Sequence, residues 1–455
     1  MSQQFNPKIR LTLGIATLLT VSLASGCNSL YNNSQTRNKQ LAPQNQAIEN
    51  LSFTQQENSN APQSNFPLTL SQAASITTSP HNYLNAQKTL DNTINKQNTS
   101  SSNQYTASVP VTYPVIDEWK NYKYSISGSK ILTSGKLPTT KVNFNQTDLL
   151  TVLVNTRKYF QNYSSQDPDV QRKGLLGTQG VSVQDMLKTL DFMIATLQED
   201  IANRRATRLQ DPNFINRNFR VIKWSAYNPS NRKQQKLRIT KYAVFTHPGS
   251  RKKTAKFNTP IYSLKENANT DKFYTRYTKQ DVLSGIYEPG GKEFGKVKPL
   301  AYLTRDGLEE ALMQGTILIN FTDGTKAFFN VDRNNGMSYV RGVKATAQKR
   351  YWYFREVDAI KGYGYKIDAK ISIKPGVTFA GDVLNIGLGK VIVLEHTQGG
   401  RKRLQMGVIA DTGGAFLPNL HQLDFLAGIF QNKNDFGQYI RQLPEYATAY
   451  ILVKK

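Results

Sequence analysis

Apolar positions recur at two different spacings along the chain. Over residues 149–160 and 183–201 they fall three and four apart, which predicts two amphipathic helices. Asn145 or Thr147 can cap the first of these helices. Ser182, with an aspartate three residues later, is close to a capping box and predicts where the second one begins.

The rest of the chain after the helices contains short apolar runs separated by turn residues, a pattern typical of strands. The clearest case is residues 317–331, where Asp323 and Gly324 lie between two alternating runs and predict a hairpin. Many short strands after two helices predict a mainly β fold with N-terminal helices. Further strands are predicted at 220–224, 236–245, 300–304, 351–354, 382–386, 391–394, 406–410 and 449–453.

The N-terminus has the pattern of a secretory signal over residues 1–26. Lys8 and Arg10 precede an uncharged apolar run, and small residues lead to Cys27. This run is too short to span a membrane comfortably. Cys27 is the only cysteine, so it cannot form an internal disulfide. Its position resembles the lipobox of bacterial lipoproteins, which implies a lipidated cysteine and, because Asn28 follows, an outer-membrane lipoprotein facing the periplasm. The alternative is a cleaved signal with an incidental cysteine.

Composition divides the chain after the signal into two parts. Residues 27–115 are rich in Asn, Gln, Ser and Thr and poor in aromatics, so they cannot bury enough apolar surface to fold and are predicted to form a disordered tether. Residues 116–455 are long enough for two domains. The formal net charge of +26 favours a polyanionic partner, although lysines can also serve solubility alone. Peptidoglycan, which carries carboxylates, fits an exported lipoprotein better than nucleic acid does.

The candidate chemistry lies at the end of the apolar run 406–410. Asp411 ends this run, and Gly413 and Gly414 predict a sharp turn directly after it. An acid held at the end of a buried strand is partly desolvated, which raises its pKa and suits it to donate a proton near neutral pH. The alternative is that Asp411 only caps the turn. A second carboxylate, Asp424, follows another short apolar segment.

Asp-Thr-Gly-Gly-Ala at 411–415, followed by Leu-Asp-Phe at 423–425, resembles the three-Asp motif of the membrane-bound lytic murein transglycosylase A (MltA) family. The resemblance implies that Asp411 is the catalytic acid. It also implies a double-psi β-barrel built from residues 116–240 and the three-Asp domain 343–455. A smaller β domain, 241–342, is inserted between them, and a groove between the domains holds the glycan.

Weaker matches to the family are scattered between these motifs. They imply substrate-binding roles for Tyr242, Gln314, Asn335 and Tyr339, together with Asp424, Gly413 and Gly414. The sequence also departs from the family pattern. It has no Glu-Pro pair after Tyr242, it reads Thr-Ile where the family has Ser-Gly after Gln314-Gly315, and it reads Phe-Leu-Pro after Ala415.

This resemblance implies a lytic transglycosylase that cleaves the β-1,4 bond between N-acetylmuramic acid and N-acetylglucosamine and forms 1,6-anhydro-N-acetylmuramic acid. It needs no metal or cofactor, and four histidines with one lipidated cysteine make a metal cluster hard to build. The expected partners are peptidoglycan strands and the membrane, not nucleic acid, with cell-wall remodelling proteins as an option. Two alternatives stay open: a non-catalytic wall-binding protein with a degenerate groove, and a hydrolase using Asp411 with Asp424.

Overall fold

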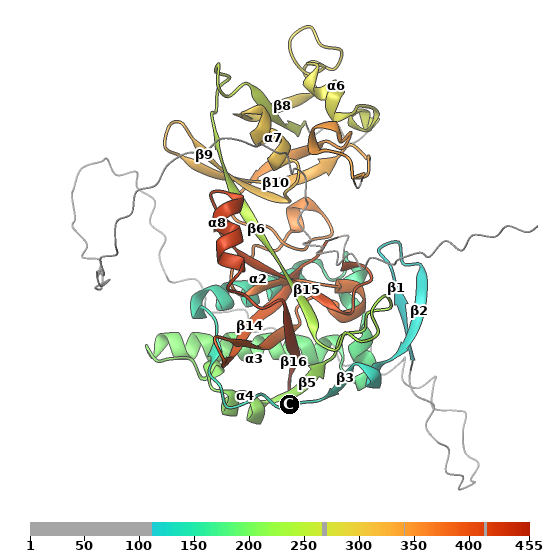
Figure 1. Ribbon diagram of the computed structural model, residues 1–455, viewed down its shortest axis with the longest axis vertical. Helices are drawn as coiled ribbons and strands as arrows, with labels where there is room; N and C mark the ends of the chain where they lie inside the picture. The colour runs from blue at the N-terminus through green and yellow to red at the C-terminus, as the bar shows by residue number, and fades with distance from the viewer. Residues whose placement is uncertain (1–111, 266–270, 341, 414–415) are drawn as a thin grey trace, which may run out of the picture. The chain divides into compact units, whose positions relative to one another are not determined.

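The computed structural model describes residues 112–265, 271–340, 342–413 and 416–455 (Figure 1). The predicted signal over 1–26, Cys27 and the tether up to residue 111 lie outside the described residues. The first strand begins at Thr112, a few residues before the predicted end of the tether. Among the described residues, the search for a helix long and apolar enough to cross a membrane finds none.

Both predicted amphipathic helices are confirmed. α2 covers Gln146–Tyr163, and the side chain of Asn145 caps it by accepting a hydrogen bond from the backbone of the first turn. α3 covers Val183–Ala202 and begins with a complete capping box. Shorter helices are α4 (Pro212–Asn218), α6 (Lys279–Leu283), α7 (Arg305–Ala311) and α8 (Lys433–Ile440). Single turns include η3 (Pro168–Gln171) and η9 (Val383–Gly387), the latter a π-helix.

Strands are the commonest kind of element among the described residues, which confirms the mainly β prediction. They are β1 (Thr112–Ile116), β2 (Tyr122–Ser127), β3 (Leu132–Ser134), β4 (Val142–Asn143), β5 (Phe219–Trp224), β6 (Leu237–Gly249), β7 (Thr259–Leu264), β8 (Val297–Leu303), β9 (Thr316–Phe321), β10 (Lys326–Asn334), β11 (Trp352–Val357), β12 (Thr378–Ala380), β13 (Val391–Gln398), β14 (Arg401–Asp411), β15 (Gln422–Phe430) and β16 (Tyr446–Lys454). The predicted hairpin is β9–β10, and Gly324 in its turn has a φ of +84°, which glycine adopts without strain.

One long sheet path carries the candidate site. Its central strands follow the order β6, β15, β12, β14, β13, β16, and β16 also pairs with β6, so these six strands close into a ring. The pairs β6–β15 and β12–β14 are parallel, whereas the other neighbours in the ring are antiparallel. Closure removes the free sheet edges that would otherwise need protection.

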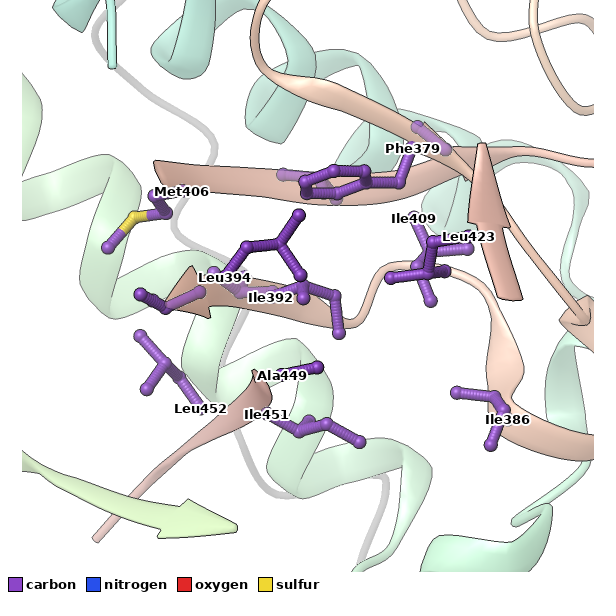
Figure 2. Packing of buried hydrophobic residues seen from close by; sticks show 14 of the residues in the cluster. Phe379, Ile386, Ile392, Leu394, Met406, Ile409, Leu423, Ala449, Ile451 and Leu452 are labelled. Carbon is purple, nitrogen blue, oxygen red and sulfur yellow. The ribbon is translucent and has the colours of Figure 1, made fainter. Parts of the chain in front are cut away.

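Apolar side chains from the ring strands and the two long helices share one core. Ile392 and Leu394 on β13, Ile409 on β14 and Leu423 on β15 are all buried (Figure 2). Consecutive residues of β13 and β14 are buried, so both faces of these strands are covered. The same cluster includes Leu190 of α3, so the helices and the ring form one packed body.

A second core lies in residues 261–354. β6 leaves the ring and pairs with β9 through residues 246–249, which joins the two regions along one strand. Tyr351, Tyr353 and Phe354 are fully buried in this second core, and β11 pairs with β10. The second core therefore continues past the boundary predicted at residue 342.

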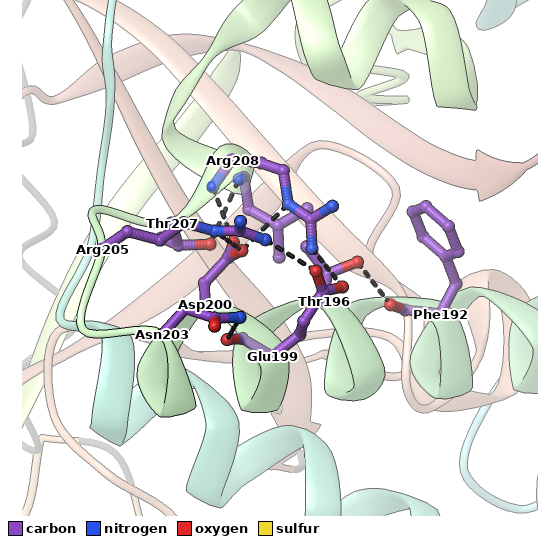
Figure 3. A network of polar contacts seen from close by, with 9 residues as sticks. Phe192, Thr196, Glu199, Asp200, Asn203, Arg205, Thr207 and Arg208 are labelled. Atoms are coloured by element: carbon purple, nitrogen blue, oxygen red, sulfur yellow. Dashed lines mark hydrogen bonds and ion pairs between the residues drawn. The ribbon is translucent and has the colours of Figure 1, made fainter.

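The corner after α3 is held by charged hydrogen bonds. Asp200 is fully buried and accepts a hydrogen bond from Nε of Arg205 at 2.7 Å and another from Nε of Arg208 at 2.9 Å (Figure 3). The backbone N–H of Arg208 donates to its other oxygen at 2.8 Å. Both arginines also bind Glu199. This network fixes the turn between α3 and α4.

The strand predicted at 382–386 is wrong. Asp382 instead caps the π-helix η9, because its side chain accepts hydrogen bonds from the backbone and the side-chain amide of Asn385 at 2.9 and 2.8 Å. The apolar run there is buried, but local side-chain capping competes with the sheet ladder for its backbone.

Candidate active site

Asp411 is the last residue of β14, and two donors hold its carboxylate. The hydroxyl of Tyr242 on β6 donates to Oδ2 at 2.7 Å, and the backbone N–H of Thr412 donates to Oδ1 at 2.8 Å. Burial raises the pKa of this carboxyl to about 6, although the two hydrogen bonds and the charge of Lys370 offset part of the effect. The residue keeps part of its surface exposed. Such a carboxyl can both give and accept a proton near neutral pH.

Asp424 lies two strands away from Asp411 at the same height in the ring. Ala380, on the short strand β12, pairs with Asp411 on one side and with Asp424 on the other. Two strand spacings separate their backbones by about 10 Å. Burial raises the pKa of Asp424 to about 7, and the negative charge of Asp411 contributes to this shift. Oδ1 of Asp424 is buried and has no hydrogen-bond partner among the described residues.

A lysine missed by the sequence analysis lies in the electrostatic field of Asp411. Burial lowers the pKa of Lys370, and the charge of Asp411 acts against that shift. Its Nζ donates to Oδ1 of Asn330 at 2.6 Å, and Asn330 in turn donates to the carbonyl of Gly315 at 2.8 Å. The second core therefore reaches the surroundings of Asp411 through one hydrogen-bonded lysine. The sequence around Lys370 has no pattern that marks it.

Asp382 is a second residue that the sequence analysis did not single out as part of the site. It is fully buried, and burial raises its pKa to about 6, partly offset by hydrogen bonds from Asn419 and Asn385. The backbone N–H of Asn419 donates to its Oδ2 at 2.8 Å. Asp382 thus binds the segment that follows Asp411. Its only sequence signal was an acid inside an apolar run.

The glycines predicted after Asp411 are described only in part. The carbonyl of Gly413 accepts a hydrogen bond from the backbone of Phe416 at 2.9 Å, so a turn does follow the acid. A Cβ on Gly413 would meet only a side-chain atom of Phe416, at an ordinary 3.8 Å. Gly414 lies outside the described residues.

The structure brings Tyr242, Asp411 and Asp424 together, but it places the other predicted residues differently. Gln314 holds β6, because its Oε1 accepts from the backbone of Phe245 at 2.9 Å. Asn335 is buried, and its amide donates to the backbone carbonyls of residues 277 and 349. This occupies the side chain with structural partners, so the proposed site leaves it out.

Tyr339 packs within the second region. The guanidinium of Arg350 lies 5.2 Å from the centre of the Tyr339 ring and 4.1 Å from the ring of Trp352. Burial lowers the pKa of Arg350. Tyr339 remains partly exposed, so it can still offer a ring face to a ligand.

A cavity of about 260 Å³ lies near the start of β14. Arg403 and Leu404 at the start of β14 line it, together with Lys241 and His396. Neither Asp411 nor Asp424 lines this cavity. The candidate site is therefore defined by its acids and their partners rather than by this cavity. A search for clusters of possible metal ligands among the described residues finds none.

Comparison with known proteins gives a structural likeness without sequence relatives. No protein-family model matches the chain, and no curated protein matches its sequence. A membrane-bound lytic murein transglycosylase from Agrobacterium tumefaciens aligns with a TM-score of 0.49 and 15% identity, covering 71% of this chain and 98% of that one. MltA from E. coli with bound chitohexaose gives 0.47 and 16% over 71% and 94% of the two chains. MltA from Neisseria gonorrhoeae gives 0.44 and 13% over 68% and 87%.

These structural neighbours are MltA lytic transglycosylases, the same family that the Asp411 motif resembles. With identities of 13–16% and TM-scores below 0.5, the likeness does not itself assign an activity to this chain. The function therefore rests on the chain's own residues.

Proposed function

We propose that the chain is a peptidoglycan lytic transglycosylase in which Asp411 is the sole acid–base. It would cleave the β-1,4 bond between N-acetylmuramic acid and N-acetylglucosamine. The observation that carries the proposal is the carboxyl of Asp411: its pKa is raised to about 6, and Tyr242 and the N–H of Thr412 fix its position. The motif that begins at Asp411 supports the same assignment.

One carboxyl is enough for this reaction. Protonated Asp411 gives its proton to the bridging oxygen, and the bond from that oxygen to the anomeric carbon of N-acetylmuramic acid breaks. The donors from Tyr242 and Thr412 stabilise the carboxylate that is left. This carboxylate then takes the proton of the C6 hydroxyl, whose oxygen attacks the anomeric carbon of the same sugar. The products are a 1,6-anhydro sugar and a new chain end, and Asp411 is protonated again.

The proposed setting follows from the sequence. A lipidated Cys27 would anchor the chain to the outer membrane, facing the periplasm, and residues 28–115 would tether the folded part. The net charge of +26 favours an anionic wall polymer over a neutral one. The closed six-stranded ring supports a double-psi β-barrel with an inserted β domain. Neither a metal nor a cofactor is part of the proposal, and wall-remodelling proteins are candidate partners.

Asp424 favours a second candidate function, a hydrolase with two carboxylates. Both acids have raised pKa values, and the register across Ala380 sets their backbones about 10 Å apart. Glycosidases place their two carboxyls at roughly 5 to 10 Å, depending on mechanism. Such an enzyme would release reducing-end sugars. A third possibility is a wall-binding protein without activity, for which the departures after Ala415 are the main support.

Product analysis separates the three. Peptidoglycan sacculi would be incubated with the purified full chain or with its Asp411→Asn variant, and mass spectrometry would identify any released fragments. We expect anhydro fragments from the wild type and none from the variant. Reducing-end products would assign hydrolysis and make Asp424 the partner acid. Binding to sacculi without any product would overturn both enzymatic proposals.

A further inference from the structure

The β1–β2 hairpin presents two aromatic side chains to solvent at the start of the folded part. Trp119 is 76% exposed and Tyr122 is 62% exposed. Large aromatic side chains are normally buried for most of their surface, so a pair displayed on one hairpin loop indicates an interaction surface.

The loop that displays them is held in one conformation. Asp117 is 6% exposed, and its Oδ1 accepts hydrogen bonds from the N–H of Trp119 at 3.0 Å and of Asn121 at 2.8 Å. Its Oδ2 pairs with Lys123 at 2.8 Å. Lys120 adopts a φ of +63°, which is costly for a residue other than glycine. A loop that keeps this strain and still exposes a tryptophan is preorganised for contact.

One set of contacts connects the hairpin to the segment after Asp411. The backbone of Ile116 exchanges hydrogen bonds with the side chain of Asn385 at 3.1 and 2.8 Å. Asn385 in turn donates to Asp382, which also accepts from the N–H of Asn419 at 2.8 Å.

A second set connects the hairpin to the end of β14. Lys120 pairs with Asp169 in η3 at 3.1 Å. Two residues earlier, Asp167 accepts from the hydroxyl of Tyr363 at 2.9 Å, and the backbone N–H of Tyr363 donates to the carbonyl of Ala410 at 2.9 Å. The hairpin is therefore attached to chain segments on both sides of the candidate acid.

We propose that Trp119 and Tyr122 form a distal binding platform for the glycan strand whose cleavage Asp411 carries out. This inference rests on the function proposed above. Sugar rings present a face of C–H groups that packs on an aromatic ring, so stacking would hold part of the strand on the hairpin. The structural links to Asp382 and Ala410 keep the platform and the acid at a fixed separation.

The paired charges on the hairpin favour the uncharged faces of sugar rings over an anionic membrane surface. Anionic lipid headgroups attract unpaired lysines. Both lysines near the loop are already paired, Lys123 with Asp117 and Lys120 with Asp169. Glu118 adds a negative charge beside Trp119. The loop therefore offers aromatic surface with little positive charge.

The test measures binding without turnover, in the full chain carrying Asp411→Asn and purified in detergent. The probes are peptide-free glycan strands of long and short defined length, titrated by calorimetry. We expect Trp119→Ala in this background to weaken binding of long strands about two- to tenfold, with short fragments that cover only the Asp411 region unaffected. Trp119→Phe should recover part of the loss. Asp117→Ala, which releases the loop but keeps the tryptophan, should also weaken binding of long strands.

Fluorescence gives an independent readout because the chain has three tryptophans, of which Trp224 is 1% exposed and Trp352 is covered by Arg350. Long strands should change the emission of Trp119 and leave that of the Trp119→Phe variant unchanged. Phe294→Ala is the matched control, since Phe294 is 61% exposed in the other region. It should bind like the parent.

Equal affinity of the parent and Trp119→Ala for long strands, with unchanged circular dichroism, would overturn the proposal. Loss of binding to phosphatidylglycerol vesicles, with glycan binding intact, would also overturn it and assign the loop to a membrane. Failure of the proposed function looks different: the wild type would release no anhydro fragments, whatever the binding of the Trp119 variants.

Discussion

The corner after α3 and the end of β14 each hold an aspartate among protein atoms, and the two carboxyls behave in opposite ways. Asp200 is fully buried, yet hydrogen bonds from Arg208 and Arg205 outweigh its burial and lower its pKa. Around Asp411, burial is opposed only by Tyr242, the N–H of Thr412 and the charge of Lys370, and its pKa rises to about 6. The comparison shows that the balance between desolvation and the hydrogen bonds and charges around an acid decides whether it can act as a proton donor near neutral pH.

The largest expected effect is the loss of activity when Asp411, the acid with the raised pKa, is replaced. Asp411→Asn keeps the shape of the side chain but removes the transferable proton. We expect the rate of anhydro-sugar release to fall by about 10² to 10⁴, the usual contribution of a general acid. Asp200→Asn serves as the control and should keep most of the activity. A variant at Asp411 with near-normal rates would remove this residue from the chemistry.

We expect Asp200, whose carboxylate is bound by two arginines, to contribute to stability rather than to activity. Asp200→Ala removes charged hydrogen bonds to Arg205 and Arg208, so the free energy of unfolding should fall by about 1.5–3 kcal/mol. The lowered folded-state pKa means that this stabilisation is present above the unfolded-state pKa of about 3.9 and is lost as the pH falls further. Urea unfolding at pH 7 and at pH 3 checks both statements. An equal loss at both pH values would mean that packing, not charge, explains the effect.

Asp424 should show the opposite pH dependence. Its pKa is raised to about 7, so its carboxyl favours the folded state below pH 4 and progressively less as the pH rises through 7. Asp424→Asn should therefore stabilise the protein at pH 8 by about 1–3 kcal/mol and leave its stability at pH 3 nearly unchanged. Thermal unfolding at the two pH values measures this difference. Destabilisation at pH 8 would show that the charged form of Asp424 has partners that hold it.

The smallest expected effect is a shift in a pH profile. The hydroxyl of Tyr242 lowers the pKa of Asp411, so Tyr242→Phe should raise that pKa above its present value of about 6. Because the reaction begins with protonated Asp411, the fall in kcat/KM on the alkaline side should then move to higher pH. Measuring kcat/KM against pH for the variant and the wild type checks this shift. If the alkaline fall in kcat/KM stayed at the same pH while the rate dropped, Tyr242 would be a substrate contact and would not set the pKa of Asp411.

Local patterns predicted the elements whose stability is local. The spacing in α2 and α3, the capping box at Ser182 and the Asp323-Gly324 turn each depend on residues within a few positions of one another, and all three are present in the structure. The same holds for Asp411 at a strand end followed by a turn. The run at 382–386 failed because capping by Asp382 offered its backbone a different set of hydrogen bonds.

The sequence by itself therefore determined the two helices, most of the strands, the acid at the end of β14 and the motif that suggests a wall-cleaving enzyme. The resemblance already named Tyr242 and Asp424, but only the tertiary structure decided how these two residues and Lys370 act on that acid. Tyr242 donates to Asp411 across 169 positions of the chain, and the charge of Lys370 acts on it from another distant segment. Asp424 lies level with Asp411 in the ring because both residues pair with Ala380 of β12, the strand between them. Desolvation and charge act through space, and the closed ring sets those distances, so no pattern along the chain could show them.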